Sequence, residues 1–226
     1  MNNKNIFIVT LEVGIVICII LAGIMIYSNF EIRNELAKME NDLNIMNKNL
    51  QENITMLIEK TGELKASESF LKSYLLGLGT YYNASGLYDE AEVRYNKASE
   101  KYESGYWSSA STWYENSMRW YNDTGFKYKE SRDIFKEAAE NTSNTTCKNI
   151  CLLYVDMMNT SSIAITYLYE ASEFYQSSCE FYLTGDYTEA HESKNNAEKK
   201  LTYYNEEMNK FDDYQEELQN ILIGII

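Results

Sequence analysis

Proline is absent from this chain of 226 residues, and glycine occurs only ten times. The tight turns of β-sandwiches and of α/β barrels depend on both residues, so their scarcity argues against these folds. The sequence therefore predicts an all-α protein.

Residues with catalytic or metal-binding chemistry are also scarce, since the sequence has one histidine and four cysteines. It contains no glycine-rich phosphate loop, and neither H-E-x-x-H nor G-x-S-x-G occurs. His191 and the cysteines lack the C-x-x-C spacing of zinc sites. We therefore expect a protein that is not an enzyme and that has no catalytic residues, cofactor or metal.

The charge balance is strongly acidic, with 34 Asp and Glu against 20 Lys and Arg and a formal net charge of −14. Such a surface repels phosphate backbones at long range. The sequence therefore predicts no nucleic acid partner.

A long apolar run extends from Ile6 to Tyr27 and is interrupted only by Thr10 and Glu12. About 20 apolar residues are enough to cross a bilayer. We expect a transmembrane anchor over residues 6–28 in contact with membrane lipid, preceded by a short tail at 1–5. All of residues 29–226 would then lie on the other side of the membrane.

The distribution of Lys and Arg does not show on which side of the membrane residues 29–226 lie, because these residues are nearly balanced on the two sides of the anchor. Asn-x-Ser/Thr triplets provide a second indication. The triplets are in modest excess over chance for such an Asn-rich composition, and they favour an extracytoplasmic location and glycosylation. The candidate glycosylation sites are Asn53, Asn83, Asn122, Asn141, Asn144 and Asn159. In the inverse orientation the domain would face the cytoplasm and the triplets would be accidental.

Leucine recurs every seven residues from Leu36 to Leu78, and Met39, Met46, Asn53 and Lys60 follow successive leucines by three positions, so the seam is apolar at first and polar further along. This spacing is typical of a coiled-coil seam, and it predicts a heptad stalk over 29–65. A leucine stripe can pack against a second copy in a homodimer or against helices of its own chain. Both alternatives stay open at this point.

Small and aromatic residues replace leucine after residue 71. Gly79, Tyr82, the turn at Gly86-Leu87-Tyr88, and then Ala91, Tyr95 and Ala98 make residues 72–104 resemble a tetratricopeptide repeat. Echoes of the signature Gly-x-aromatic-x-x-Ala occur near 105–117 and 174–198. The resemblance implies helical hairpins that bind proteins. A plain up-and-down helical bundle is the competing interpretation.

The expected domains after the stalk are helical hairpins at 66–140 and a C-terminal hairpin at 148–226, separated by a polar loop at 141–147. The expected helices cover 6–60, 66–84, 87–103, 106–122, 126–140, 148–182, with a break near Asn159, and 186–222. Cys147, Cys151 and Cys179 are candidates for one disulfide bond and one free thiol.

Aromatic residues are concentrated at the centre of the sequence, and tyrosine alone accounts for 20 residues. Trp113 and Trp120 share one face of the expected helix, and Tyr114 and Tyr121 share the next. Two aromatic faces exceed what one core contact needs, so we expect one face to remain partly exposed beside a concavity. The candidate binding residues are Tyr106, Trp107, Trp113, Tyr114, Trp120 and Tyr121; the alternative is that all of them belong to the core.

These features together predict a membrane-anchored, non-catalytic scaffold that presents a protein-interaction domain outside the cytoplasm. A receptor or sensor that acts through a partner is one alternative, and a scaffold that faces the cytoplasm is another. The sequence does not identify the partner.

Overall fold

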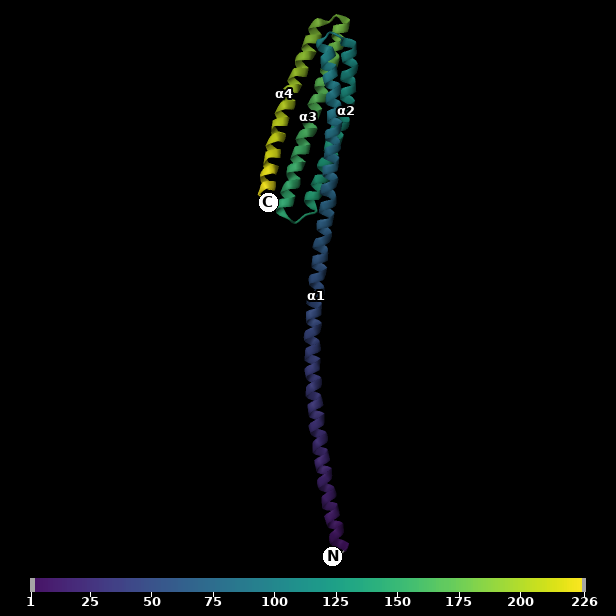
Figure 1. Cartoon of the computed structure of the whole chain (residues 1–226), viewed down its shortest axis with the longest axis vertical. Coiled ribbons are helices and arrows are strands. Elements are labelled where there is room, and N and C mark those ends of the chain that lie inside the picture. Colours follow the sequence, from purple (N-terminus) through teal and green to yellow (C-terminus); the bar gives the residue numbers. More distant parts are fainter. Residues whose placement is uncertain (1–2, 225–226) are drawn as a thin grey trace. The chain divides into compact units, whose positions relative to one another are not determined.

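The computed structural model describes the backbone of residues 3–224; within this range, the side chains of residues 3–20, 22–24, 26, 27 and 29 fall outside the description. Four helices make up the described chain: α1 (Asn3–Glu103), α2 (Trp107–Glu140), α3 (Thr145–Thr184) and α4 (Tyr187–Ile223). Figure 1 shows their order along the sequence. The chain divides into two compact units, and the boundary follows Gly62.

The structure does not support the transmembrane helix that was expected over residues 6–28. No helix within the described residues combines the length and the apolar character that a membrane crossing requires. Most side chains in 6–28 lie outside the description. The fold class is therefore corrected to all-α without this element.

The described part of the first unit is the N-terminal portion of α1. Every residue from 30 to 62 is helical and exposed. The break expected between the helices at 6–60 and 66–84 is absent, since α1 continues through these residues, and the Thr61 hydroxyl donates to the Leu57 carbonyl one turn earlier, at 2.7 Å.

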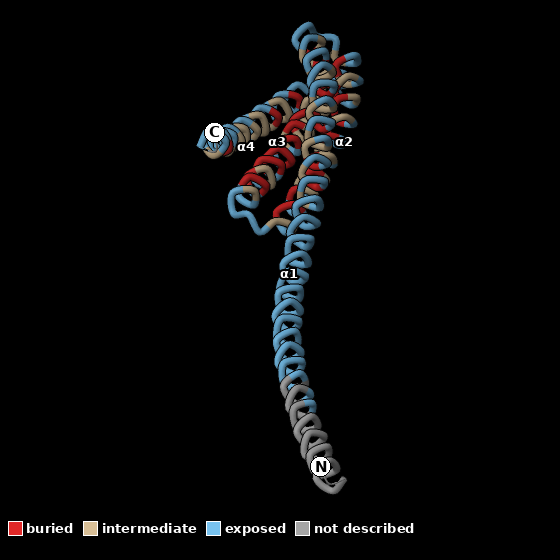
Figure 2. The backbone as a smooth tube through the Cα atoms, turned by 60° about the horizontal axis from the view of Figure 1, so that its bottom comes forward, coloured by how far each residue is buried: buried red, intermediate tan, exposed pale blue. Residues whose placement is uncertain are grey.

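The second unit is a bundle of four helices, to which α1 contributes residues 63–103. The helix faces that point toward one another are buried, as Figure 2 shows. Short connections join the helices, so consecutive helices run in opposite directions. The helices are therefore arranged up and down, an arrangement that is also compatible with helical hairpins.

Two of the three connections are glycine turns with the same geometry. Gly105 and Gly185 have φ angles of 76° and 88°, a left-handed conformation that glycine adopts without strain. In each turn the next residue donates its backbone N–H to a carbonyl five residues earlier, Tyr106 to Lys101 and Asp186 to Phe181, both at 2.9 Å. This is the hydrogen bond of a Schellman helix end.

The third connection joins α2 to α3, where the polar loop was expected. The side chain of Asn144 accepts a hydrogen bond from the backbone N–H of Cys147 at 3.0 Å, and this cap starts α3 at Thr145. The other expected breaks, at Gly86, Gly125 and Asn159, lie inside continuous helices. An interior glycine costs only about 1 kcal/mol relative to alanine, so packing against neighbouring helices overrides it.

Aromatic rings from α1 and α2 pair in a ladder through the bundle. Because the two helices are antiparallel and both repeat every seven residues, the rings form five successive pairs, with centroids 5.1 to 6.5 Å apart. The pairs are Tyr102–Trp107, Tyr95–Tyr114, Tyr88–Tyr121, Tyr81–Tyr128 and Tyr74–Phe135. Each such pair adds about 0.5–1.5 kcal/mol beyond the area it buries.

Small residues alternate with these rings at the same seven-residue period and let the helix backbones approach. They are buried, and they comprise Gly77, Ala84, Ala91 and Ala98 on α1 and Ala110, Ser117, Thr124, Ser131 and Ala138 on α2. At one of these positions, the Ser131 hydroxyl donates to the carbonyl of Gly77 at 2.9 Å. A seven-residue period in every helix is the pattern of left-handed, coiled-coil-like packing.

The hairpin α1–α2 and the hairpin α3–α4 are related by a shift of 80 residues. The corresponding positions include Tyr74 and Tyr154, Tyr95 and Tyr175, Tyr102 and Tyr182, Gly105 and Gly185, and Ala110 and Ala190. Rings at three of these positions are in contact between the parallel helices α1 and α3, with centroids 6.0, 6.3 and 6.1 Å apart. Four packed helices of this kind are compatible with repeated helical hairpins.

Candidate functional site

The two glycine turns lie at the same end of the bundle and form a surface that we call the tip. Its exposed apolar side chains are Tyr106, Leu183 and Tyr187, of which 64%, 57% and 64% is accessible to solvent. Trp107 and Trp113 are half-buried beside them. The tip therefore combines residues from both hairpins.

An open groove of about 650 Å³ runs along the tip. It is lined by Gly105, Tyr106, Trp107, Ser108, Ser109, Thr112, Trp113, Asn116 and Leu183. None of these residues is charged, although the chain carries a net charge of −14. The groove therefore offers aromatic and aliphatic surface edged by hydroxyl and amide groups, a composition that suits an uncharged segment of a partner.

Ring stacking and hydrogen bonds hold the floor of the tip in place. Trp107 stacks on Tyr182 with centroids 4.2 Å apart and an interplanar angle of 14°, and the edge of Tyr102 contacts Trp107. The Tyr102 and Ser178 hydroxyls lie 2.8 Å apart, and Ser178 donates to the Ala190 carbonyl at 2.7 Å. Burial raises the pKa of Tyr102. Its hydroxyl therefore stays protonated at neutral pH.

The six candidate aromatic residues separate into three groups. Tyr106, Trp107 and Trp113 lie at the tip, whereas Tyr114 and Tyr121 are only 1% exposed and belong to the ring ladder. Burial of these two tyrosines also raises their pKa values. One aromatic face of α2 is thus buried and the other is partly exposed.

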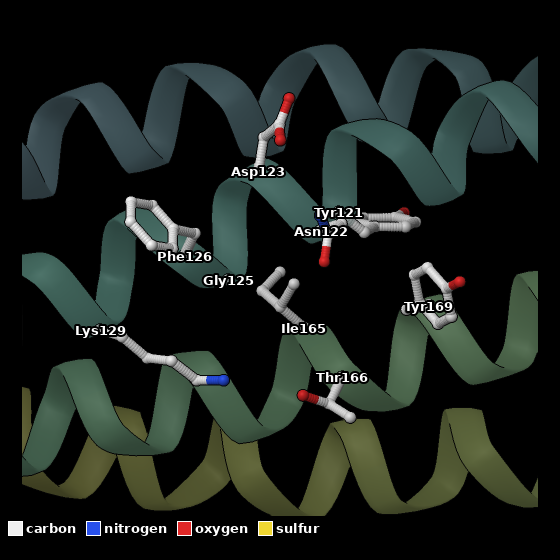
Figure 3. Close-up of a pocket in the computed structure, with 9 residues that line it drawn as sticks. All are labelled: Tyr121, Asn122, Asp123, Gly125, Phe126, Lys129, Ile165, Thr166 and Tyr169. Carbon is white, nitrogen blue, oxygen red and sulfur yellow. The ribbon is translucent and has the colours of Figure 1, made fainter.

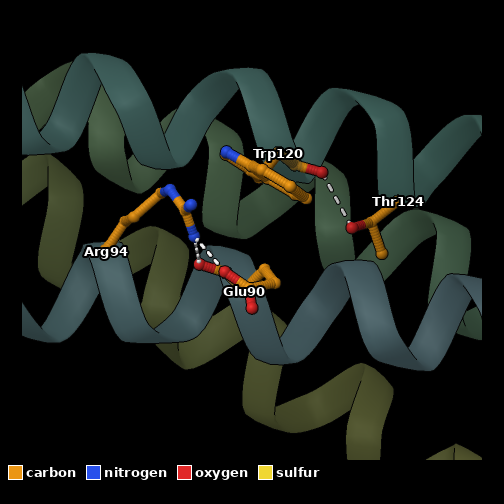
Figure 4. Close-up of polar contacts among 4 residues, drawn as sticks. All are labelled: Glu90, Arg94, Trp120 and Thr124. Carbon is orange, nitrogen blue, oxygen red and sulfur yellow. Dashed lines mark hydrogen bonds and ion pairs between the residues drawn. The ribbon is translucent and has the colours of Figure 1, made fainter.

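Trp120 is the remaining candidate and lies further along α2. The guanidinium of Arg94 lies 4.3 Å from the centroid of its ring, and Arg94 also pairs with Glu90 at 2.7 Å (Figure 4). Trp113 has a similar neighbour, because the Lys97 ammonium is 4.9 Å from its ring. Cations on α1 therefore cover part of the outer aromatic face, and a cation over a tryptophan ring adds about 0.5–1 kcal/mol at exposed sites.

A second groove, of about 410 Å³, lies between α2 and α3 (Figure 3). Gly125 opens it, since an added Cβ atom would lie 3.5 Å from Ile165. Asp123 and Lys129 bring charge to its edges, and the hydroxyl of Thr166 already donates to the Ser162 carbonyl. Its polar groups do not converge on one point, so we do not treat it as the principal site.

The three candidate disulfide cysteines are all free thiols. Cys151 and Cys179 are buried on the continuous helix α3, and 28 residues at 1.5 Å each separate them by about 42 Å. No disulfide can join them within one chain at that distance. Burial raises the pKa of Cys151 to about 11 and that of Cys179 to about 12, so both thiols stay protonated at neutral pH.

The candidate glycosylation asparagines all lie at accessible positions. Asn53, Asn83, Asn122 and Asn159 are exposed on helices, Asn141 ends α2, and Asn144 caps α3. Their modification stays a prediction. Groups of three or more His, Cys, Asp or Glu side chains arranged to hold a metal are absent from the described part of the chain.

Tyr182, Leu183 and Tyr187 complete the tip but were not among the predicted site residues. The signal that marks them is the Gly-x-aromatic-x-x-Ala signature at Gly185, which repeats the one at Gly105. Because the two hairpins are related by the 80-residue shift, both glycine turns lie at one end of the bundle.

In comparisons with known proteins, no family model, curated protein or solved structure matches the chain. The geometry of the tip therefore carries the functional argument.

Proposed function

We propose that this protein is a non-catalytic helical scaffold that binds a protein partner through the tip. The observation that carries the proposal is the uncharged groove at the tip, where Tyr106, Leu183 and Tyr187 are exposed on an otherwise acidic chain. Aromatic side chains are enriched at the centres of protein interfaces, and charged residues are depleted there.

The rigidity of the tip supports this role. Trp107 is fixed between Tyr102 and Tyr182 by ring contacts, and both turns are closed by backbone hydrogen bonds. A surface whose side chains are already ordered loses little conformational entropy on binding. The tip is therefore better suited to recognition than a flexible loop would be.

The resemblance of residues 72–104 to a tetratricopeptide repeat belongs to this proposal. Two hairpins that correspond over an 80-residue shift support a repeat-like origin of the bundle, and stacked helical hairpins commonly present binding surfaces. The location of residues 29–226 outside the cytoplasm stays a prediction.

Site-specific photocrosslinking in the cells that make the protein tests the proposal. A photoreactive amino acid at Tyr106 or at Tyr187 should capture one discrete protein, because both side chains are exposed at the tip. The same amino acid at Tyr82 or Phe126, which are 69% and 65% exposed elsewhere on the bundle, serves as the control.

The charge-introducing variant Leu183→Glu should abolish capture at the tip and leave the melting temperature unchanged, since Leu183 is exposed. Absence of a crosslinked protein, or the same products at the tip and at the control positions, would contradict the proposal.

A further inference from the structure

The proposed function does not involve an exposed apolar stripe on α1. It is formed by Leu36, Met39, Leu43, Met46 and Leu50, each between 56% and 71% exposed, and Leu57 continues it. We call these residues the leucine stripe. Leaving this much apolar surface in water is unfavourable, because burial of apolar surface stabilises a protein in proportion to the area that is buried.

The heptad frame of the leucine stripe continues without a shift into the bundle. Counting in sevens from Met39 leads through Met46, Asn53 and the polar, exposed positions Lys60 and Ser67 to Tyr74, Tyr81, Tyr88, Tyr95 and Tyr102. In the bundle these positions pack against the other helices and form the ring ladder. The same frame therefore marks a helix-packing face in both units, but in the first unit that face is exposed.

The period of the stripe indicates which kind of partner covers it. A straight helix has 3.6 residues per turn, so a strict seven-residue repeat stays on one face only when the helix supercoils around another helix. A helix that lies on a flat surface shows a broader apolar face instead. The 3-4 spacing from Leu36 to Leu50 thus favours a second helix with the same period.

Asn53 specifies the orientation of that second helix. Asn53 occupies the same position of the seven-residue repeat as Met39 and Met46. In a parallel, in-register pair it faces its own copy, and two carboxamides can each donate and accept a hydrogen bond. This pairing favours the in-register alignment, because any other alignment would bury the carboxamide against an apolar side chain.

We infer that the protein forms a homodimer through a parallel, in-register, two-stranded coiled coil over residues 36–57. The occupant of the leucine stripe is a second copy of this chain. Each assembly then carries two copies of the tip, and a partner with two binding sites would be held more tightly through avidity.

Disulfide trapping in the full chain tests the parallel register. In a background with Cys18→Ser and Cys147→Ser, the variant Met46→Cys should oxidise to a covalent dimer, because each residue 46 faces its copy. The matched control Lys48→Cys lies on the opposite side of the frame and should stay monomeric under denaturing electrophoresis. Equal yields at both positions, or no covalent dimer at position 46, would overturn the inference.

Mass measurement tests the seam independently. The full chain should have twice its monomer mass of 26.3 kDa. The double variant Leu43→Asp with Leu50→Asp should raise the dissociation constant by about 100-fold or more, since buried unpaired charges are costly. Asn44→Asp with Gln51→Asp adds the same charge outside the seam and should leave the dimer intact.

Thermal unfolding of the bundle gives the control for folding. The bundle should melt at the same temperature in both double variants, because residues 36–57 belong to the first unit. A parent chain that is monomeric, or an unchanged dissociation constant in the seam variant, would show that the stripe does not bind a second copy.

Discussion

The hydroxyl groups of Tyr88 on α1 and Tyr204 on α4 lie 2.9 Å apart, and their hydrogen bond joins the first helix of the bundle to the last. A cavity of about 120 Å³ lies beside this pair and is also lined by Tyr128, Ser161 and Phe211. Burial raises the pKa of Tyr88, which keeps its proton in place. The bundle is therefore closed by a polar contact inside an aromatic core.

Removing either hydroxyl should destabilise the bundle. Tyr88→Phe and Tyr204→Phe should each lower the free energy of unfolding by about 1 kcal/mol, because the remaining hydroxyl loses its partner. The double variant should cost less than the sum of the two single variants. Urea unfolding of the four proteins gives the coupling energy, with the exposed Tyr82→Phe as a control that should have no effect. Strict additivity would show that the contact contributes nothing.

Two neighbouring glycines of α1 should respond in opposite directions to substitution. Gly77 is buried, and an added Cβ atom would lie 3.0 Å from the Phe135 ring, so Gly77→Val should lower the free energy of unfolding by about 1–3 kcal/mol. Gly79 has no atom within 4 Å of that position, so Gly79→Ala should raise it by about 1 kcal/mol. Thermal melts that shift in the same direction would contradict this packing.

Stability should fall at alkaline pH because of the buried tyrosines. Burial raises the pKa values of Tyr88, Tyr114 and Tyr121 above the ordinary value of 10.0. Above about pH 10 the unfolded chain loses phenolic protons that the folded chain keeps, so the stabilisation is complete below that pH and is lost above it. Each tyrosine contributes a slope of about 1.4 kcal/mol per pH unit.

Urea unfolding across alkaline pH measures this slope. Tyr114→Phe should make it shallower, because one buried phenol is removed. A stability that does not change between neutral and strongly alkaline pH would mean that these rings are accessible to water in the folded protein.

Thiol reactivity should distinguish Cys147 from the other two cysteines of α3. In the Cys18→Ser variant, an alkylating reagent should modify Cys147, which is half-buried, before Cys151 and Cys179, which are buried and have raised pKa values. All three should react after denaturation. Mass spectrometry of tryptic peptides reports the order, and early modification of Cys179 would contradict the structure of the core.

Helix content could be predicted from the absence of proline, but helix ends could not be read from glycine. Gly86 and Gly125 lie in continuous helices, whereas Gly105 and Gly185 end them. The aromatic residue and the buried alanine that follow a glycine do not identify the true turns, because Tyr88 and Ala91 follow Gly86 at the same spacing as Trp107 and Ala110 follow Gly105. Local propensity alone predicts a helix break equally at all four glycines.

The candidate site was predicted in part. Tyr106 and Trp107 directly follow Gly105, so a turn predicted at this glycine also predicts their position at the end of a helix. The separation of Trp113 from Tyr114 was also visible, but which face lies inside depends on Ala110 and Ser117, which share the inner face with Tyr114. The contribution of Leu183 depends on pairing between hairpins 80 residues apart, and no local period reveals that contact.

The alternation of rings and small residues has a consequence for how the helices align. A core that repeats every seven residues is degenerate, because sliding one helix by seven residues again sets rings beside small side chains. The polar contacts are not periodic: Ser131 reaches the Gly77 carbonyl, and Tyr102 reaches Ser178, in one alignment only. A slid helix would leave these groups buried without partners at about 1–3 kcal/mol each. The hydroxyl groups therefore select one native alignment from several that the ring ladder alone would accept.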